Sequence, residues 1–187
     1  MIFMASIKDI KFRRRRESKT NYRKRLALVK SNMCRIVVRK SNKRIMGQIV
    51  KYEEKGDKVL AYAGSEELKK FNWQSRANRS TAYLTGLLLA KKAKSLSQEC
   101  ILDIGLSQPV KNSIPFVFAK GCVDGGLKIN GSFDIDAKVY DLSGSNYAKE
   151  LKEKDPEKYK KEYSSYIKAK LEPESLHVLF EEVKKKI

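Results

Sequence analysis

Residues 8–44 carry most of the positive charge of this chain, and that charge limits what the segment can fold into. The segment contains sixteen Lys or Arg residues and only two acidic residues, Asp9 and Glu17, which gives it a net charge of +14. Like charges at this density repel one another and keep a free segment extended or disordered. Because the whole chain of 187 residues has a formal net charge of +19, the rest is much more balanced. We therefore expect a charged arm ahead of a folded body.

The densest part of the arm is the run Arg13–Arg16, which is followed by four more cations and Tyr22 within nine residues. Phosphates would neutralise these side chains and release condensed counterions. Arginine suits this task because its planar guanidinium forks onto phosphate and stacks on unpaired bases. Extended, the first 25 residues would reach roughly 80 Å. The pattern predicts an arm that folds on a large nucleic acid, with a targeting-like tract or a solvated tail as the alternatives.

Several protein classes are disfavoured by the composition. No apolar stretch approaches the eighteen or so residues that a membrane span requires, and the apolar opening, residues 1–5, is too short for a signal-peptide core. Cys34, Cys100 and Cys122 are odd in number, far apart and set in apolar runs. This pattern fits reduced buried thiols better than disulfides or a zinc site. We expect a soluble cytoplasmic protein.

Short apolar runs after the arm predict the strands of a sheet. Residues 35–39, 45–52 and 59–63 form three such runs, and turns at 41–44 and 54–57 join them into an antiparallel meander. Residues 100–106 are typical of a strand buried on both faces, which we expect to pair parallel to an earlier strand.

The helical pattern predicts two long helices in the body. The first covers residues 75–94, and its interior Gly86, which costs about 1 kcal/mol relative to Ala, indicates close backbone packing. The second covers residues 116–127 after a start at Ser113–Pro115, and Gly121 again permits close packing. The resulting order β-β-β-α-β-α implies a mixed α/β layered domain.

The C-terminal third changes character. Residues 130–145 have the composition of a loop, and residues 147–187 are rich in Lys, Glu and Tyr. Tyr159, Tyr163, Tyr166 and Ile167 recur at helical spacing, so we expect one or two peripheral helices on which these residues form a packed structural face.

Particular strings in this chain closely resemble a known family. These strings are Arg13–Glu17, Lys19–Leu26, Val38–Lys43, Ala82–Leu88, Leu102–Leu106 and Lys158–Lys168. Together they resemble the archaeal and eukaryotic branch of the large-subunit ribosomal protein that binds 5S rRNA, called protein eighteen in bacteria and protein five in eukaryotes. The resemblance spans about residues 8–180.

The resemblance implies a fold and a role. The implied fold is an α/β, ribonuclease-H-like mixed sheet with helices on its faces. We expect a basic arm and lead-in (1–34), a mixed α/β core domain (35–130), and a loop with a helical C-terminal extension (131–187). The implied partners are 5S rRNA, 23S rRNA and neighbouring proteins in the central protuberance of the cytoplasmic large subunit. The resemblance implies no cofactor, metal, membrane or small-molecule substrate.

Residue-by-residue matching to the family also implies the RNA-contacting positions. The arm supplies Arg13, Arg14, Arg15, Arg16, Lys19, Asn21, Tyr22, Arg23, Lys24 and Arg25, and the first hairpin supplies Arg39, Lys40, Ser41, Asn42, Lys43 and Arg44. We expect the cations to fix the register of the RNA backbone, and the four uncharged residues to contact sugars or exposed bases. Gln48 and Tyr52 either continue this surface or face the core.

Two other readings of the chain are open. Asp103, Asp124, Asp134 and Asp136 could hold two Mg²⁺ ions in a metal-dependent RNA-cleaving enzyme, although their spacing is unspecific. A non-ribosomal protein that binds structured RNA is the other alternative. The sequence has no phosphate-binding Gly-Lys-Ser/Thr motif, no zinc-spaced cysteines and no dinucleotide-binding glycine pattern.

Two single residues are assigned structural roles. Trp73, before the first long helix, is expected to anchor the core or a loop, with base stacking as the alternative. His177, the only histidine, has no convincing catalytic partner in sequence.

Overall fold

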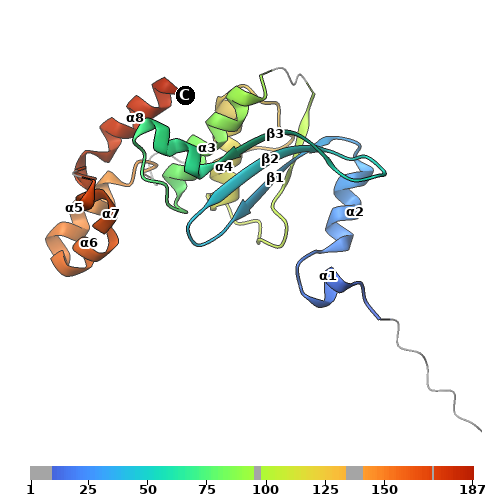
Figure 1. Ribbon diagram of the computed structural model, residues 1–187, viewed down its shortest axis with the longest axis horizontal. Helices are drawn as coiled ribbons and strands as arrows, with labels where there is room; N and C mark the ends of the chain where they lie inside the picture. Colours follow the sequence, from blue (N-terminus) through green and yellow to red (C-terminus); the bar gives the residue numbers. More distant parts are fainter. Residues whose placement is uncertain (1–9, 95–97, 134–140, 170) are drawn as a thin grey trace, which may run out of the picture.

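The computed structural model describes residues 10–94, 98–133, 141–169 and 171–187 (Figure 1). In chain order its elements are α1 (Arg13–Arg16), α2 (Tyr22–Lys30), β1 (Cys34–Lys40), β2 (Ile45–Lys51), β3 (Lys58–Gly64), the 3-10 helix η1 (Ser65–Phe71), α3 (Arg79–Lys92), β4 (Cys100–Asp103), α4 (Ile114–Asp124), α5 (Ser145–Lys154), α6 (Pro156–Glu162), α7 (Ser164–Lys168), the 3-10 helix η2 (Pro173–Ser175) and α8 (Leu176–Lys186).

The sheet has four strands in the order β3-β2-β1-β4. β1 pairs antiparallel with β2, with Ile36 opposite Ile49, and β2 pairs antiparallel with β3. β4 joins the other edge of β1 in parallel, with Ile36 opposite Leu102. The predicted antiparallel meander, the predicted parallel fourth strand and the mixed α/β class are thereby confirmed.

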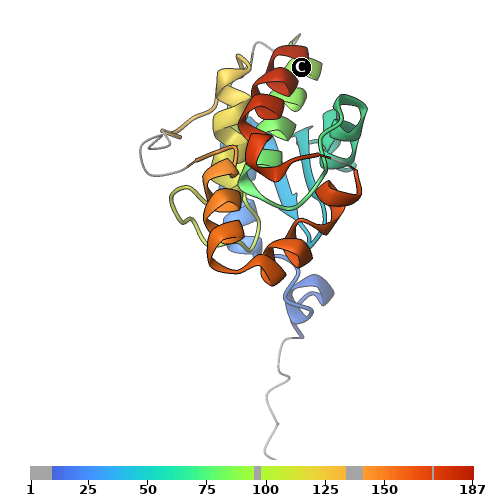
Figure 2. The same cartoon turned by 90° about the vertical axis from the view of Figure 1, so that its left-hand side faces the viewer.

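Side chains alternate across this sheet as strand geometry requires. Ile36, Val38, Ile45 and Ile49 point to one face and are 2% exposed or less. Helices α3 and α4 pack on that face, as the two cartoon views show (Figures 1 and 2). Gln48 lies on the opposite face from Ile49 and is half-buried, while Tyr52 just beyond β2 is exposed. The apolar core therefore lies between the sheet and this helix pair.

The two helices cross at a pair of glycines. A Cβ atom added at Gly86 would lie 2.2 Å from the carbonyl oxygen of Phe118, and one added at Gly121 would lie 2.2 Å from that of Tyr83. No side chain fits at either distance. The predicted reason for both glycines, close backbone packing, is confirmed.

Some predicted boundaries in the body are wrong. The first long helix begins at Arg79 rather than residue 75, because the Asn78 side chain accepts a hydrogen bond from the Thr81 amide at 2.9 Å and caps it there. The 3-10 helix η1 was not predicted. Strand β4 ends at Asp103 rather than residue 106, because Gly105 adopts a left-handed φ of 62° and turns the chain away.

The expectation of an extended arm is wrong for residues 13–16 and 22–30, which form helices α1 and α2. Asn21 caps α2 by accepting a hydrogen bond from the Lys24 amide at 3.1 Å. A helix brings neighbouring cations closer together than an extended chain does, so other contacts must offset their repulsion. The Asn21 cap, the ion pair of Arg25 with Asp57 and the half-buried Leu28 and Val29 supply these contacts.

The described part of the C-terminal segment forms four α-helices rather than one or two. Asp155 leaves helical geometry between α5 and α6 and caps α6, which separates the first two. Tyr159, Tyr163 and Tyr166 are buried, with neighbouring ring centroids 5.2 and 6.0 Å apart. Their predicted role as a structural face is confirmed, but the prediction is wrong for Ile167, which is 45% exposed. The middle of the predicted 130–145 loop, residues 134–140, lies outside the described residues.

Helix α8 closes the core at the C-terminal end. Its Phe180 ring lies 5.9 Å from the ring of Trp73 and 5.7 Å from that of Tyr83. Trp73 is 1% exposed and donates a hydrogen bond from Nε1 to Thr81 Oγ1 at 3.0 Å. Trp73 is therefore a core anchor, as predicted, and not a base-stacking residue.

The three cysteines are buried free thiols, as predicted. Burial raises the pKa of Cys100 to about 11 and raises the pKa of Cys122 as well. A protonated thiol is a poor nucleophile and a poor metal ligand, so these residues fill the core.

Candidate nucleic-acid interface

All sixteen residues that the sequence assigns to RNA contact are solvent-exposed in the structure. Ten lie in the arm and six in the hairpin between β1 and β2. Helix α2 contributes no fully buried side chain, and Leu28 and Val29 are its half-buried residues. The cations of the arm are therefore available to a ligand.

The arginine run forms one helical turn that folds back toward α2. Arg14 Nε donates a hydrogen bond to Thr20 Oγ1 at 2.8 Å, while Glu17 pairs with both Arg13 and Lys19. The turn is completed by Ser18, which has a left-handed φ of 51°. Because one glutamate serves two cations, the arm keeps a large excess of positive charge.

Tyr22 is held in place by a second aromatic residue. Its ring centroid lies 5.3 Å from that of Phe12, at an interplanar angle of 49°. Phe12 is 72% exposed and Tyr22 is 36% exposed, so both rings retain free surface. Such surface suits stacking on an unpaired base. The sequence reasoning missed Phe12, although an aromatic residue directly before the arginine run was a visible signal.

A groove of about 610 Å³ lies between the arm and the edge of the sheet formed by β1 and β4. Its cationic lining comprises Arg14, Lys19, Lys24 and Arg25 from the arm and Arg39 and Lys40 from β1. Apolar side chains, among them Leu28 and Leu102, line the same groove. With Asn21, the groove gathers seven of the sixteen predicted residues. Residues 41–44 are not part of its lining.

The hairpin residues have different surroundings. Arg39 donates hydrogen bonds to the carbonyl oxygen of Asp103 at 2.8 Å and to its carboxylate at 3.1 Å. Arg44 pairs with Glu66 at 2.5 Å, and both of those side chains are exposed. Arg39 thus links β1 to the end of β4, and 44% of its side chain stays exposed. Its role in binding stays a prediction.

A chain of charges connects the arm to the sheet. Arg25 Nη2 lies 3.0 Å and Arg35 Nη2 lies 2.5 Å from the same oxygen of Asp57. On its other side, Arg35 Nη1 lies 3.3 Å from Asp103. Arg35 is 2% exposed, so this chain runs from solvent into the protein. The sequence reasoning missed Asp57 and Arg35 because no local pattern marks a partner that is 22 residues away.

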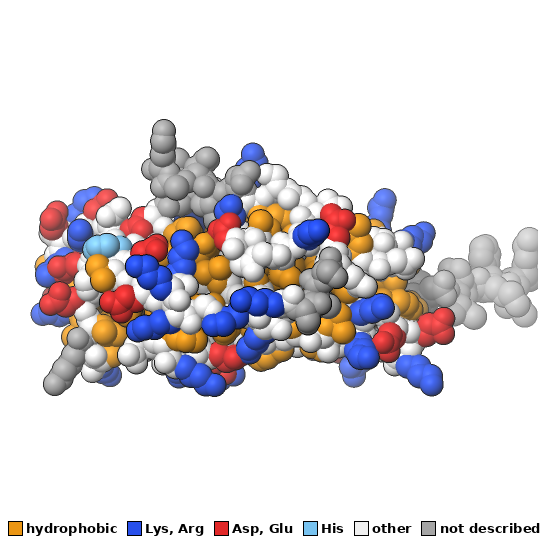
Figure 3. All heavy atoms as spheres, turned by 90° about the horizontal axis from the view of Figure 1, so that it is seen from above, with side chains coloured by type: hydrophobic (Ala, Val, Ile, Leu, Met, Phe, Trp, Pro, Cys, Tyr) orange, Lys and Arg blue, Asp and Glu red, His pale blue; other side chains and the backbone are white. Residues whose placement is uncertain are grey.

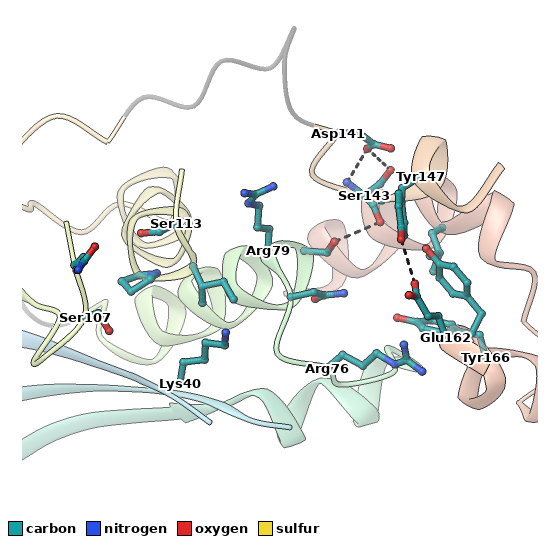
Figure 4. Close-up of a pocket in the computed structure, with 18 residues that line it drawn as sticks. Lys40, Arg76, Arg79, Ser107, Ser113, Asp141, Ser143, Tyr147, Glu162 and Tyr166 are labelled. Atoms are coloured by element: carbon teal, nitrogen blue, oxygen red, sulfur yellow. Dashed lines mark hydrogen bonds between the residues drawn. The ribbon is translucent and has the colours of Figure 1, made fainter. Parts of the chain in front are cut away.

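A second cavity, of about 710 Å³, shares Lys40 with the groove as a lining residue (Figure 4). It is bounded by the first residues of α3 and α4 and by the C-terminal helices, and its lining includes Arg76, Arg79, Asp141 and Glu162. Cations and carboxylates are thus mixed here. This composition contrasts with the lining of the groove, where the one carboxylate is Asp103.

The carboxylate of Asp141 remains charged at neutral pH. Burial alone would raise its pKa, but hydrogen bonds from the Asn146 amide and from Ser143 bring the pKa below its ordinary value. A fixed negative charge at this position disfavours phosphate. The cationic lining of the groove therefore suits phosphate better than this cavity does.

The C-terminal helices also mix charges. Residues 145–187 contain eleven Lys and nine acidic residues. Blue basic and red acidic side chains are intermixed at the left-hand end of the molecule, near the pale-blue histidine (Figure 3). His177 is exposed there. Among the described residues, no helix is long and apolar enough to cross a membrane.

Comparison with known proteins gives a clear result. The model of a family described as ribosomal large subunit proteins 60S L5 and 50S L18 matches residues 8–99. A protein of Thermofilum pendens named large ribosomal subunit protein uL18 is 47% identical over 183 residues, which cover 95% of this chain and 93% of the relative. The chain belongs to the L5/L18 family of large-subunit ribosomal proteins.

The region matched by the L5/L18 family model contains the arm, the groove-lining cations and all six hairpin residues. Membership makes the chain a ribosomal, RNA-binding protein of the large subunit. The family is structural and non-enzymatic, and this chain is accordingly not an enzyme.

The carboxylates considered for metal binding have other roles or cannot be placed. Asp103 binds two arginines, while Asp124 accepts a hydrogen bond from Tyr83 at 2.8 Å and pairs with Lys120. Asp134 and Asp136 lie outside the described residues. Within the described part of the chain, no three His, Cys, Asp or Glu residues are grouped as a metal site.

Proposed function

We propose that this protein binds 5S rRNA and helps to attach it to 23S rRNA in the central protuberance of the large subunit. The observation that carries the proposal is the exposure of all sixteen predicted contact residues. An exposed cation can reach phosphate, either directly or by exchanging an internal ion pair such as that of Arg13 with Glu17, and each phosphate contact releases a condensed counterion. The arm supplies eight cations for this purpose.

The charged and the uncharged residues of the predicted surface have distinct roles in this proposal. Arg13–Arg16 and the cations of α2 follow the RNA backbone and set its register. Tyr22, Asn21, Ser41 and Asn42 meet sugars or unpaired bases, where RNA sequence is recognised. The groove between arm and sheet combines both roles, because its apolar lining accepts a base while its cations hold the flanking phosphates.

The proposal extends to architecture. The mixed sheet with α3 and α4 on one face is compatible with a ribonuclease-H-like arrangement. We assign residues 1–34 to the arm and its lead-in, 35–130 to the core domain and 131–187 to a C-terminal extension. The mixed charges of that extension suit 23S rRNA or a neighbouring ribosomal protein.

A matched pair of charge variants tests the proposed function. Replacing Arg13, Arg14, Arg15 and Arg16 by Gln removes four exposed cations from the arm, and replacing Lys168, Lys184, Lys185 and Lys186 by Gln removes four from the C-terminal helices. Affinity for 5S rRNA is measured over a salt series. The arm variant should bind more weakly, and the slope of log K against log salt should fall by up to roughly three.

The control variant should keep both the affinity and the slope for 5S rRNA. An unrelated structured RNA, measured at matched salt, supplies the comparison for specificity. Equal losses in the two variants would show that only total charge matters. A wild-type protein that does not prefer 5S rRNA to the unrelated RNA would contradict the proposed function.

A further inference from the structure

Asp57, in the turn between β2 and β3, lies where the arm meets the body. One of its carboxylate oxygens accepts hydrogen bonds from two arginines: Arg25 of α2 at 3.0 Å and Arg35 of β1 at 2.5 Å. Arg25 is half-exposed, whereas Arg35 is almost completely buried. Asp57 therefore links an exposed cation of the arm to a buried cation of the sheet.

The sheet side of this link is firmly held. Arg35 is also paired with Asp103, at 3.3 Å. Asp103 in turn accepts hydrogen bonds from Arg39 at 3.1 Å and from the Gly105 amide at 2.9 Å. Each partner is thus oriented by another group, which fixes the position of the Asp57 carboxylate relative to β1 and β4.

The arm has few other attachments to the body. Within the described part of the arm, the ion pairs of Arg13 and Lys19 go to Glu17, inside the arm itself, and the pair of Arg25 goes to Asp57. Apolar packing is modest as well, because Leu28 and Val29 are only half-buried. The contact between Arg25 and Asp57 is therefore a large part of what orients α2.

We infer that Asp57 is a positioning residue for RNA binding: its carboxylate holds Arg25, and with it helix α2, so that the cations of the arm face the groove. The inference rests on the proposed function. It predicts that removing the Asp57 carboxylate lowers the affinity for RNA, whereas the change in charge alone would raise it. Removing an acidic residue raises the affinity of a protein for RNA through charge alone, but removing this one releases the helix that carries the cations.

The first experiment compares two variants that lose the same charge from the same turn. Asp57→Asn removes the negative charge that pairs with Arg25 and leaves a neutral amide in its place, and Glu54→Gln removes an exposed carboxylate three residues away. Affinity for 5S rRNA should fall about threefold to fivefold in Asp57→Asn, the range expected for a partly exposed ion pair. Glu54→Gln should bind equally or more tightly. An equal or higher affinity in both variants would overturn the inference.

A double-mutant cycle shows whether Asp57 acts through Arg25. If it does, Asp57→Asn should weaken binding in the wild-type background and cause no further loss in an Arg25→Gln background. An undiminished loss in the Arg25→Gln background would assign the effect to the buried Arg35 instead. That result would also contradict the positioning role.

A third measurement needs no RNA. Backbone amides of residues 25–30 should exchange hydrogen about fivefold faster in free Asp57→Asn than in the free wild type, and unchanged rates would overturn the inference. Arg25→Gln leaves the pairs of Arg35 in place, so it tests the same contact if Asp57→Asn does not fold. A wild type that fails to bind 5S rRNA would contradict the proposed function, while hydrogen exchange would still decide the role of Asp57.

Discussion

At Gly86 and Gly121 the absence of a side chain sets how closely α3 and α4 approach. The Cβ of Gly86→Ala would lie 2.2 Å from a backbone oxygen, which cannot move out of the way as a side chain can. We expect the substitution to destabilise the protein by about 1–3 kcal/mol, a cost that the better helix propensity of Ala offsets by up to about 1 kcal/mol. Urea denaturation measures the change.

Lys91→Ala, at an exposed position of the same helix, is the control for an alanine that meets no backbone, and it removes one long hydrogen bond from Lys91 Nζ to the Lys186 carbonyl oxygen at 3.5 Å. It should shift the urea midpoint very little. If Gly86→Ala were as stable as this control, the two helices would be able to separate without cost, and close packing would not explain the glycine.

The structural roles of single residues were predictable to different degrees. Gly86 and Trp73 stand out in sequence because each interrupts or precedes an apolar helical pattern, and the structure confirms both predictions. The burial of Arg35 was not predictable. Its two carboxylate partners lie 22 and 68 residues away, and only the register of three strands and a turn brings them together.

At the scale of a helix, the cap of α2 determines whether the arm is ordered. Asn21 accepts a hydrogen bond from the Lys24 amide, an interaction that Ser can replace and Ala cannot. Asn21→Ala should reduce the stability of α2 by about 1 kcal/mol, whereas Asn21→Ser should preserve it. NMR chemical shifts of residues 22–30 report the helical population. Equal populations in the two variants would show that tertiary contacts alone hold the helix.

The helical arm is also where sequence reasoning was least accurate. The density of charge predicted an extended segment, and the cap at Asn21 was the signal that pointed to a helix instead. The strands were more predictable, because alternation of apolar residues depends on local spacing alone. Among the predicted site residues, sequence pattern marked the cations. It did not show that Arg39 and Lys40 share a groove with Arg14 and Lys24.

At the scale of the whole molecule, the proposed RNA-binding surface and the buried contacts of α8 lie at different ends. The arm leaves one end of the sheet, while α8 lies at the other end, against α3 (Figures 1 and 2). The arm carries exposed charged side chains and no fully buried residue in α2, whereas α8 is held by contacts between buried aromatic side chains. A substitution at the C-terminal end should therefore change folding and leave the RNA-binding arm intact.

Phe180→Ala tests this separation. The substitution removes a ring that is 5% exposed and contacts both Trp73 and Tyr83, so it should cost about 3–5 kcal/mol. Trp73 is the single tryptophan of the chain, and its fluorescence reports on this contact while circular dichroism reports on the whole fold. Both signals should shift to lower urea together, because α8 and the core share one cluster of buried side chains.

The control is Val178→Ala, at an exposed position of α8, which should stay within about 0.5 kcal/mol of the wild type. Under conditions where Phe180→Ala is folded, its affinity for 5S rRNA and the salt slope should equal those of the wild type. A fluorescence change at lower urea than the circular dichroism change would show instead that α8 unfolds on its own. In that case the C-terminal helices would form an independent unit, and their contacts with the core would contribute little to the stability of the surface that binds RNA.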